Sequence, residues 1–389
     1  MRPTHPLYTG MPTTIFEVMS RLAIEHKAVN LGQGFPDVDG PQEVRQVAAD
    51  ALLAGPNQYP PMMGLPALRQ AVADSENRFF GIERQVQDVL ITSGATEALS
   101  DCLMAIIEPG DEVVVFDPCY DCYVPLIERA GGTPKLIALE PPHWSFTDEA
   151  LDDVFSDRTK AILFNNPLNP ASKVFSAEEL QRIAARLVKH DAYAICDEVY
   201  EHLVFGSAKH IPLSTLPDMA ERCVRIGSAG KTFSLTGWKV GYVSGPQALI
   251  DSIAKAHQFT TFTTPPHLQV AVAHGLAMPD SYYQGLADDL AAKRDRLAAG
   301  LTDAGLPTLK AEGSYFLIAD IGDLGLGSDV EAAQRMTVEA GVTTVPMSAF
   351  YKGVAPDNLL RFCFCKRDDV LDDAVARLKA WRARGFTAA

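Results

Sequence analysis

Short runs of almost wholly apolar residues alternate with helical patterns through the middle of the chain, and this alternation restricts the fold more than any other feature. A strand with one face in water alternates apolar and polar residues, whereas a parallel strand covered on both faces is apolar throughout. The pattern therefore predicts an α/β fold with a mainly parallel sheet between helices. The expected strands are Val89–Thr92, Val113–Phe116, Ala161–Phe164, Tyr193–Cys196, Val224–Ile226 and Val240–Val243.

The helical segments and the last third of the chain complete the predicted organisation. Thr96–Glu108 has an apolar stripe at helical spacing, and Ser176–His190 begins with a capping box between Ser176 and Glu179. The tail predicts a smaller α+β unit, to which the first residues of the chain return. We expect a large domain over residues 45–278 and a small domain made of 1–44 and 279–389. The tail elements expected are helices Leu286–Leu301 and Asp368–Ala383 and strands Ser314–Ile318, Thr343–Val345 and Asn358–Cys365.

The charge balance argues against some classes of partner. The 389 residues contain 34 Lys and Arg against 49 Asp and Glu, a formal net charge of −15. Such a surface repels the phosphates of nucleic acids and anionic membranes, so we expect neither as a partner. No stretch approaches the roughly 18 uninterrupted apolar residues of a membrane span, and the start lacks the apolar core of a signal peptide. We therefore expect a cytoplasmic protein.

The seven cysteines agree with that expectation, because their number is odd and they are scattered along the chain. Cys119 and Cys122 form a C-x-x-C sequence. No second pair or histidine cluster accompanies them, so we interpret them as packing residues; a zinc or redox site is the weaker alternative. We predict no metal site.

Polar residues follow several of the predicted strands directly. Ligands of open parallel sheets bind at the carboxyl ends of the strands, so this clustering predicts a binding site there. Small residues after the first strand let backbone N–H groups approach an anion at the start of a helix, although a plain tight turn explains them equally well. The polar segments are Ser93–Thr96, Asn165–Pro170, Asp197–Tyr200 and Ser228–Ser234.

An acid and a lysine in these segments point to a particular chemistry. A buried Asp197 needs a cationic partner, or else its pKa rises; the alternative is a helix cap. A desolvated Lys231 has a lowered pKa and can attack a carbonyl, although a surface lysine is the simpler interpretation of that residue alone. Together with an anion-binding turn and the phenol of Tyr200, the two residues suit pyridoxal phosphate. The lysine would form a Schiff base, and the acid would keep the pyridine nitrogen protonated.

The same motifs resemble those of class I/II aminotransferases, which are pyridoxal-phosphate enzymes of fold type I. The resemblance covers practically the whole chain from about Thr14, and it implies a large domain with a mainly parallel seven-stranded sheet and a smaller α+β domain. Within the class, the sequence is most similar to the kynurenine/glutamine and methionine aminotransferase group, and it also resembles a succinyldiaminopimelate aminotransferase-like branch. The motifs are Leu31–Asp37, the Asn-Pro run, Asp197–Tyr200, Tyr200–Phe205, Ser228–Gly241, Pro346–Phe350 and Arg361–Asp369.

The resemblance implies a role for each matching residue. Lys231 would carry the cofactor and later move a proton, and Asp197 would pair with the pyridinium nitrogen. Tyr200 and Asn169 would hydrogen-bond the phenolic oxygen of the cofactor, and Tyr120 would lie over its ring. The phosphate would be held by Gly94, Ala95, Thr96, Ser228 and Lys239.

Three further matches concern the substrate and the partner subunit. Arg361 matches the arginine that binds the substrate carboxylate, for which a planar guanidinium suits a bidentate contact; the alternative is an ion pair with a surface acid. The backbone of Gly34 would also contact this carboxylate. Tyr59 matches a tyrosine that reaches the phosphate in the neighbouring subunit, so we expect a homodimer; the alternative is an aromatic in a turn.

Two positions depart from the family pattern. The usual Asn-Pro-Thr-Gly is here Asn169-Pro170-Ala171-Ser172, which leaves the turn geometry after the proline open. Tyr120 stands where close relatives often have Phe. Neither change affects the predicted class of enzyme.

The predicted function is transamination between an amino acid and a 2-oxo acid by a ping-pong mechanism. The segments near Ile15, Tyr59 and Phe350 are apolar or aromatic, which favours a bulky, uncharged donor such as methionine, glutamine, kynurenine or an aromatic amino acid. N-succinyldiaminopimelate as donor and β-lyase activity on cysteine conjugates are the alternatives. A transcription regulator with an aminotransferase-like domain and a nicotinamide dehydrogenase are disfavoured, the latter because no G-x-G-x-x-G follows an early strand.

Overall fold

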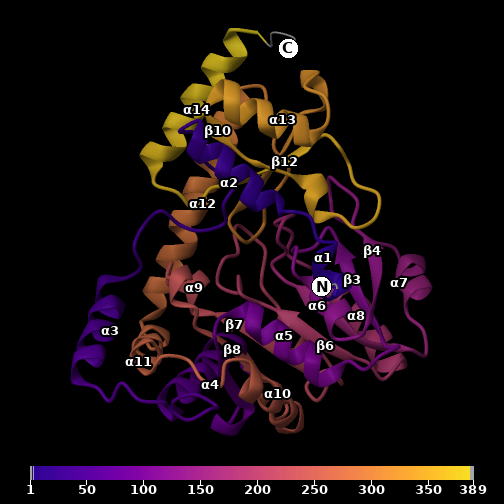
Figure 1. Ribbon diagram of the computed structural model, residues 1–389, viewed down its shortest axis with the longest axis vertical. Coiled ribbons are helices and arrows are strands. Elements are labelled where there is room, and N and C mark those ends of the chain that lie inside the picture. Colours follow the sequence, from indigo (N-terminus) through magenta and orange to yellow (C-terminus); the bar gives the residue numbers. More distant parts are fainter. Residues whose placement is uncertain (1, 3, 386–389) are drawn as a thin grey trace.

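The computed structural model describes residue 2 and residues 4–385, and its largest sheet has seven strands in the order β2-β8-β7-β6-β5-β3-β4 (Figure 1). All neighbouring strands run parallel except β8, which is antiparallel to both β2 and β7. The predicted α/β fold with a mainly parallel seven-stranded sheet is confirmed. The strands are β2 Val89–Thr92, β3 Glu112–Asp117, β4 Thr133–Ala138, β5 Thr159–Asn165, β6 Tyr193–Asp197, β7 Cys223–Ser228 and β8 Gly241–Ser244.

The strand that the apolar pattern misses is β4, at the edge of the sheet. It contains Pro134 and Lys135, and most of its residues are half-buried or exposed. β2, at the opposite edge, is fully buried and keeps its apolar run, whereas β4 is largely open to solvent and so lacks the run that burial on both faces produces.

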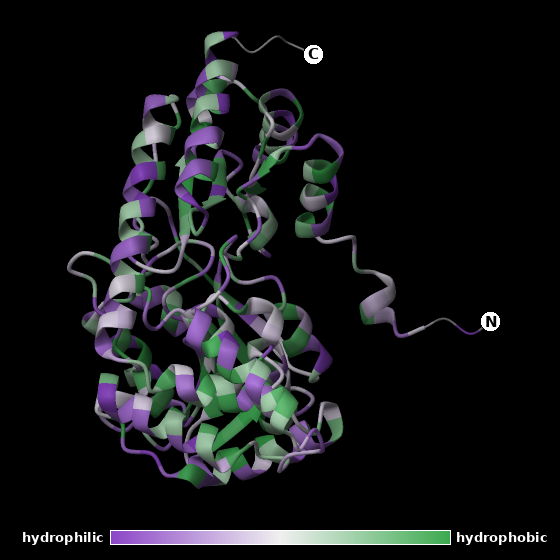
Figure 2. Cartoon of the chain, turned by 90° about the vertical axis from the view of Figure 1, so that its left-hand side faces the viewer, coloured by the Kyte–Doolittle hydropathy of each residue, from purple (hydrophilic) through white to green (hydrophobic). Residues whose placement is uncertain are grey.

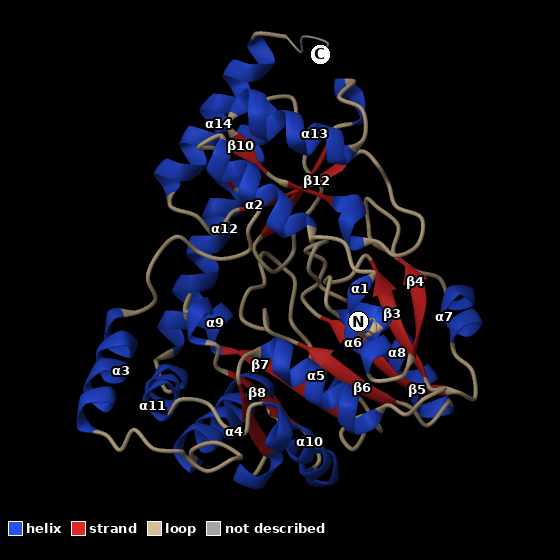
Figure 3. Ribbon diagram, in the orientation of Figure 1, coloured by secondary structure: helices blue, strands red, loops and turns tan. Residues whose placement is uncertain are grey.

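Helices cover both faces of this sheet (Figure 3). The α5 and α10 helices pack together on one face, and α8 with α7 lies on the other. The capping box predicted between Ser176 and Glu179 is present at the start of α8. Beside β2 and β8 lies a further group, α3, α4 and α11. The helices are α3 Gln42–Ala54, α4 Pro66–Phe80, α5 Ala95–Ile106, α6 Tyr123–Arg129, α7 Asp148–Val154, α8 Ala177–Lys189, α9 Ala229–Thr232, α10 Gln247–Thr260 and α11 Pro266–Leu276.

The long helix α12 (Asp280–Asp303) runs from the region of the large sheet into a smaller α+β unit (Figure 1). That unit holds an antiparallel sheet in the order β11-β12-β9 and a parallel pair, β1 with β10, which brings the amino-terminal segment onto the tail. A π-helical turn, Met336–Ala340, extends α13. The remaining elements are β1 Val29–Asn30, β9 Phe316–Asp320, β10 Val342–Thr343, β11 Val345–Pro346, β12 Leu359–Cys363, α1 Pro6–Thr9, α2 Ile15–Glu25, α13 Asp329–Arg335 and α14 Asp368–Ala383.

Two of the predicted tail strands differ from the structure. Ser314–Ile318 is displaced to β9 because Ser314 has a φ of 61°, which an extended strand does not allow. Thr343–Val345 is divided between β10 and β11, which belong to different sheets. The proposed domain limits stay a prediction, and their outermost residues 1, 3 and 386–389 lie outside the described part of the chain.

The amino-terminal segment that carries α1 runs along the outside of the molecule, while apolar residues gather in the strands of the large sheet (Figure 2). Within the described residues, none of the helices combines the length and the apolar character that a membrane span requires.

Candidate active site

A cavity of about 420 Å³ opens where the strand ends of the large sheet meet the smaller unit. Asp197 and Ser228 are the last residues of β6 and β7, Gly94 follows β2, and Arg361 comes from β12 on the opposite side. Every site residue predicted from the sequence lines this cavity, apart from Tyr59. The lining includes Gly34, Gly94, Ala95, Thr96, Tyr120, Asn169, Asp197, Tyr200, Ser228, Lys231, Lys239 and Arg361.

Lys231 lies on the single-turn helix α9, directly after β7. Its Nζ donates a hydrogen bond to the hydroxyl of Tyr315 at 2.8 Å, and it lies 3.5 Å from the carbonyl oxygen of Gly34. Burial lowers the pKa of this amine. A lysine in such a place is more readily deprotonated than a surface lysine, and so more nucleophilic.

Asp197 is a buried carboxylate whose partners in the chain are uncharged. It accepts hydrogen bonds from the hydroxyl of Tyr123 at 2.6 Å and from the N–H of Val199 at 3.4 Å. Burial raises its pKa to about 6, against an ordinary 3.8. A carboxylate held in this state favours a cationic ligand such as a protonated ring nitrogen.

The turn after β2 forms a site for an anion. Gly94 has a φ of 79°, a conformation that glycine adopts readily, and α5 begins at Ala95 with its first N–H groups free of helical partners. A Cβ on Gly94 would lie 3.2 Å from Nζ of Lys239, so the lysine approaches the turn closely. Helix N–H groups and an ammonium group together suit a phosphate.

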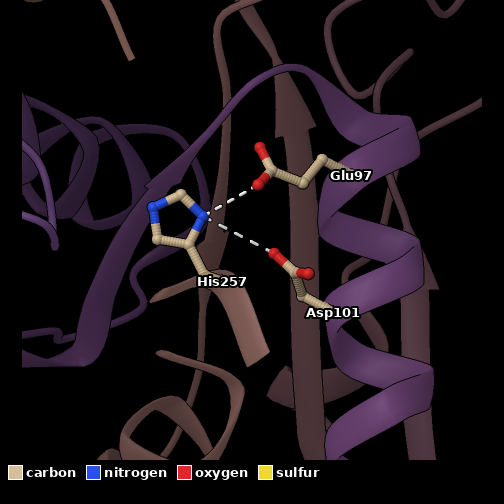
Figure 4. Close-up of side chains that lie close together, drawn as sticks. All are labelled: Glu97, Asp101 and His257. Atoms are coloured by element: carbon tan, nitrogen blue, oxygen red, sulfur yellow. Dashed lines mark hydrogen bonds and ion pairs between the residues drawn. The ribbon is translucent and has the colours of Figure 1, made fainter. Parts of the chain in front are cut away.

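A buried charge cluster of Glu97, Asp101 and His257 contacts this turn, and it was not predicted from the sequence. Glu97 accepts a hydrogen bond from the N–H of Ser93, and its Oε1 lies 2.9 Å from Nδ1 of His257. His257 also lies 3.6 Å from Asp101 (Figure 4). It contacts the carbonyl oxygen of Met62 at 3.1 Å. The available signal was the pair of acids one turn apart on a segment with an apolar helical stripe.

His257 is the cation of this cluster. Burial alone would lower its pKa, but the nearby carboxylates of Asp101 and Glu97 outweigh burial and raise the pKa to about 9. The donor atoms of Glu97, Asp101 and His257 lie within 4.8 Å of one another, as do those of a second group, Glu198, Glu201 and His210. His257 in the first group and Arg225 in the second already balance carboxylate charge, so neither geometry calls for a metal ion. The prediction of no metal site stays a prediction.

Arg361 is buried, at 1% exposure, yet it pairs with no carboxylate of the described residues. Its guanidinium donates to Oδ1 of Asn169 at 2.7 Å and to the carbonyl oxygen of Gly32 at 2.9 Å. Burial lowers its pKa to about 10, which leaves it charged at neutral pH. A desolvated guanidinium without a negative partner favours a carboxylate ligand. Three rings surround it, with centroids at 3.9 Å (Phe316), 4.6 Å (Phe350) and 5.4 Å (Phe16).

The turn after Asn169 has a serine where the family usually has glycine. Ser172 occupies that position with a φ of 57°, in the left-handed region. Its hydroxyl donates to the carbonyl oxygen of Phe316 at 2.7 Å and contacts the hydroxyl of Ser314 at 2.9 Å. These contacts offset the strain of the conformation and connect the turn to β9.

Tyr59 lies outside the cavity of its own chain. Its side chain is 86% exposed and meets the ring of Phe262 edge-on at 5.7 Å. The C-x-x-C residues lie near the site without forming a pair: Cys119 is buried in the core beneath the sheet, and all seven cysteines are free. These observations agree with the interpretation of Cys119 as a packing residue.

Three features of the cavity fit pyridoxal phosphate. The anion site at Gly94 suits its phosphate, the buried Asp197 suits its ring nitrogen, and Lys231 lines the same cavity as a reactive amine. This combination at the strand ends of an α/β sheet defines a pyridoxal-phosphate enzyme of fold type I.

Comparison with known proteins places the chain in a family. The family model "Aminotransferase class I and II" matches residues 26–378, and the chain belongs to this family. A probable N-succinyldiaminopimelate aminotransferase from Mycobacterium tuberculosis is 42% identical over 387 residues, with 96% of this chain and 98% of the relative covered. The rat kynurenine–oxoglutarate transaminase 3 is 36% identical over 408 residues, covering 96% and 89%. A solved methionine aminotransferase from Escherichia coli superposes with a TM-score of 0.94 at 38% identity, covering 98% and 100%.

The family determines the cofactor and the type of reaction. Class I and II aminotransferases use pyridoxal 5′-phosphate, and the chain is a pyridoxal-phosphate-dependent transaminase acting on amino acids and 2-oxo acids. The predictions of family, fold class, enzyme and cofactor are confirmed. The three relatives carry different substrate names, so the donor remains a matter for proposal.

Proposed function

We propose that the amino donor is bulky and uncharged, with methionine, glutamine, kynurenine and aromatic amino acids as the candidates. The observation that carries this proposal is that three aromatic rings pack around the guanidinium of Arg361, those of Phe16, Phe316 and Phe350. A donor whose α-carboxylate binds Arg361 would place its side chain against apolar rings.

The charges that line the cavity support the same choice. Among the described lining residues the basic side chains are Lys231, Lys239 and Arg361, and each has a proposed role. N-succinyldiaminopimelate carries further carboxylates far from its reacting amine, and it would need another cation or amide contact. Asp121, which also lines the cavity, would repel such groups whenever it is ionised.

The proposed roles follow from where the side chains lie. Arg361 and the backbone of Gly34 would bind the α-carboxylate of the substrate, while Nζ of Lys231 would take the proton from its Cα. The bound cofactor would supply the electron sink for that step. Asp197 would hold the ring nitrogen and Tyr120 would lie over the ring. Tyr200 and Asn169 would hydrogen-bond the phenolic oxygen, and Gly94, Ala95, Thr96, Ser228 and Lys239 would bind the phosphate.

A panel of amino donors tests the substrate class. The cofactor-loaded protein is mixed with one donor at a time, without acceptor, and the rate of the cofactor's absorbance change is followed. We expect methionine, glutamine, kynurenine and phenylalanine to exceed aspartate and glutamate by at least about 10-fold in kcat/KM, because a second carboxylate would be desolvated without a partner.

The same measurement separates the alternatives. A preference of 10-fold or so for N-succinyldiaminopimelate over methionine would contradict the proposal. Release of pyruvate and ammonia from a cysteine conjugate without acceptor would show β-lyase activity. The Phe16→Ala variant should have a lower kcat/KM for methionine and phenylalanine as donors. Its kcat/KM for alanine as donor should be unchanged, because the side chain of that substrate is too short to reach the ring, and this value serves as the internal control.

We also propose a homodimer in which Tyr59 contributes to the partner's cavity. Exposed aromatic side chains support this arrangement: Tyr59 is 86% exposed, Phe259 84% and Phe262 40%. Clustered exposed aromatic residues are typical of protein–protein interfaces.

A subunit-mixing experiment tests the shared site. Lys231→Ala and Tyr59→Ala homodimers are each expected to be poorly active. Exchange between them gives heterodimers with one intact site, so about a quarter of the wild-type activity per subunit should return. No gain on mixing, with exchange verified by differently tagged subunits, would contradict the shared site, and sedimentation of the wild type as a monomer would contradict the dimer.

A cytoplasmic location remains part of the proposal. It is supported by the cysteines, all of which are free, because disulfides are rare in that compartment.

A further inference from the structure

Tyr315, directly before β9, contacts the reactive lysine and stands outside the motifs that carry the family resemblance. Its side chain is 1% exposed. The hydroxyl donates to the carbonyl oxygen of Gly34 at 2.6 Å and accepts from Nζ of Lys231 at 2.8 Å. Tyr315 therefore joins the lysine at the end of β7 to the segment after β1.

The direction of these hydrogen bonds follows from the proton count. A phenol has one proton to donate and two lone pairs to accept with. The carbonyl oxygen of Gly34 can only accept, so the proton of Tyr315 points to Gly34 and its lone pairs face Lys231. Burial raises the pKa of Tyr315 above its ordinary value, so the phenol stays neutral and does not itself take up the proton.

The phenol is held firmly in this position. Its ring meets Tyr200 edge-on at 5.2 Å and Phe316 at 4.9 Å. The Gly34 segment packs against the same rings: a Cβ added to Gly34 would come within 2.8 Å of the Phe316 ring and 3.5 Å of the Tyr315 ring. This close packing fixes where the lysine amine can dock.

We propose that Tyr315 is the docking and positioning residue for the free amine of Lys231 during the proton transfer. This inference rests on the proposed role of Lys231. When Lys231 is not joined to the cofactor, its free Nζ would need a hydrogen-bond acceptor inside this buried site. Tyr315 supplies it and keeps Nζ beside Gly34, whose backbone is proposed to contact the same substrate.

The proton balance of the step is simple. A lone pair on Nζ takes the proton from Cα of the substrate, the C–H bonding electrons stay on the carbon side, and the amine becomes an ammonium. The lone pairs of Tyr315 and the carbonyl oxygen of Gly34 then face the new positive charge. In transamination the ammonium would pass this proton on to the cofactor's C4′ carbon, so Lys231 would end the half-reaction as a free neutral amine and Tyr315 would end it unchanged.

The kinetic test replaces Tyr315 with phenylalanine and uses Tyr283→Phe as the matched control. Tyr283 is also buried, at 5% exposure, but its hydroxyl bonds to the backbone carbonyls of Gly275 and Leu276, away from the cavity. We expect Tyr315→Phe to lower kcat by about 10- to 100-fold with KM for the donor changed less than about two-fold, since positioning is lost while substrate binding remains. The isotope effect with an α-deuterated donor should rise, and Tyr283→Phe should leave all three values unchanged.

A second readout uses the cofactor-free protein. Acetic anhydride labels Lys231 only when the amine is deprotonated, and mass spectrometry of the peptide gives the pH midpoint. Losing the acceptor at Tyr315 should lower this midpoint by about one pH unit, because the ammonium form loses a hydrogen bond. The other ionisable groups that act on Nζ are Asp197, Arg361, Cys363 and Cys365, and they are the same in both variants.

The two readouts distinguish this inference from the function on which it rests. If Tyr315→Phe behaves like Tyr283→Phe in both experiments while the wild type reacts normally, the role of Tyr315 is overturned and that of Lys231 stands. If borohydride reduction of the cofactor-loaded wild type fails to attach the cofactor to Lys231, both are overturned.

Discussion

Replacing Lys231 with alanine is expected to lower turnover by at least about four orders of magnitude while the protein still binds pyridoxal phosphate. The variant loses the nucleophilic amine and the group that moves the proton at Cα of the substrate. The anion site at Gly94, the carboxylate of Asp197 and the aromatic ring of Tyr120 all remain. Kinetics with methionine measure the loss, and equilibrium dialysis measures the cofactor that stays bound.

The control for this experiment is a lysine outside the cavity. Lys310→Ala removes an exposed ammonium that pairs with Glu312, and it should leave turnover and covalent attachment unchanged. Borohydride reduction followed by mass spectrometry should label Lys231 in the wild type and in Lys310→Ala. A covalent cofactor on the Lys231→Ala protein would contradict the assignment of the reactive lysine.

Replacing Asp197 with asparagine is expected to move activity and stability in opposite directions. Removing one partner of a buried charge pair costs about 3–5 kcal/mol, so turnover should fall by about two to four orders of magnitude. The cofactor-free variant, by contrast, should melt at a higher temperature than the wild type at pH 7.5. Calorimetry of the cofactor-free proteins and kinetics of the loaded proteins test the two halves.

The sign of the stability effect follows from the raised pKa of Asp197, about 6 in the fold against an ordinary 3.8. Because the folded-state pKa lies above the unfolded one, the contribution of this carboxyl to stability is complete below the unfolded value and is lost as pH rises through about 6. The advantage of Asp197→Asn should therefore shrink below pH 6 and be full above it. For the same reason, cofactor binding to the wild type should weaken below pH 6, where the carboxyl becomes protonated.

Asp329 provides the matched control. It is also buried, with a pKa that burial raises, but it lies away from the cavity and accepts hydrogen bonds from Ser348. Asp329→Asn should leave the cofactor's absorbance and the donor kinetics unchanged. If the cofactor-free Asp197→Asn protein were less stable than the wild type at pH 7.5, this would contradict the claim that the buried, ionised Asp197 destabilises the cofactor-free fold.

The sequence predicts the parts of the fold that burial on both faces makes distinctive. Interior strands such as Val113–Phe116 are recognisable because helices cover both sides, whereas the edge strand Thr133–Ala138 carries no such signature. The clustering of Asp197 and Lys231 was also predictable, because the carboxyl ends of neighbouring parallel strands meet at one edge of a sheet.

The missed residues are those whose importance depends on distant contacts. Tyr315 bonds to a carbonyl 281 residues away, and His257 reaches Glu97 across 160 residues. Neither stands in a motif: Tyr315 lies near the start of the predicted strand Ser314–Ile318, and His257 lies in no predicted element. The two neighbouring acids of the Asp197 motif also have different environments. Asp197 lines the cavity, whereas Glu198 accepts a hydrogen bond from Arg225 at 2.6 Å, away from the cavity.

Ser172, which replaces the usual glycine after Asn169, restricts which substitutions the sequence can accept during evolution. Ser172 adopts a left-handed conformation, and its hydroxyl is held by Ser314 and by the backbone of β9. A mutation that removes the hydroxyl of Ser314 therefore leaves more of the conformational strain at Ser172 uncompensated. Replacing Ser172 with glycine removes that strain. The two positions should be inherited as a pair: among homologues, serine at 172 should occur together with a hydrogen-bonding residue at 314, and glycine at 172 should leave 314 free to vary.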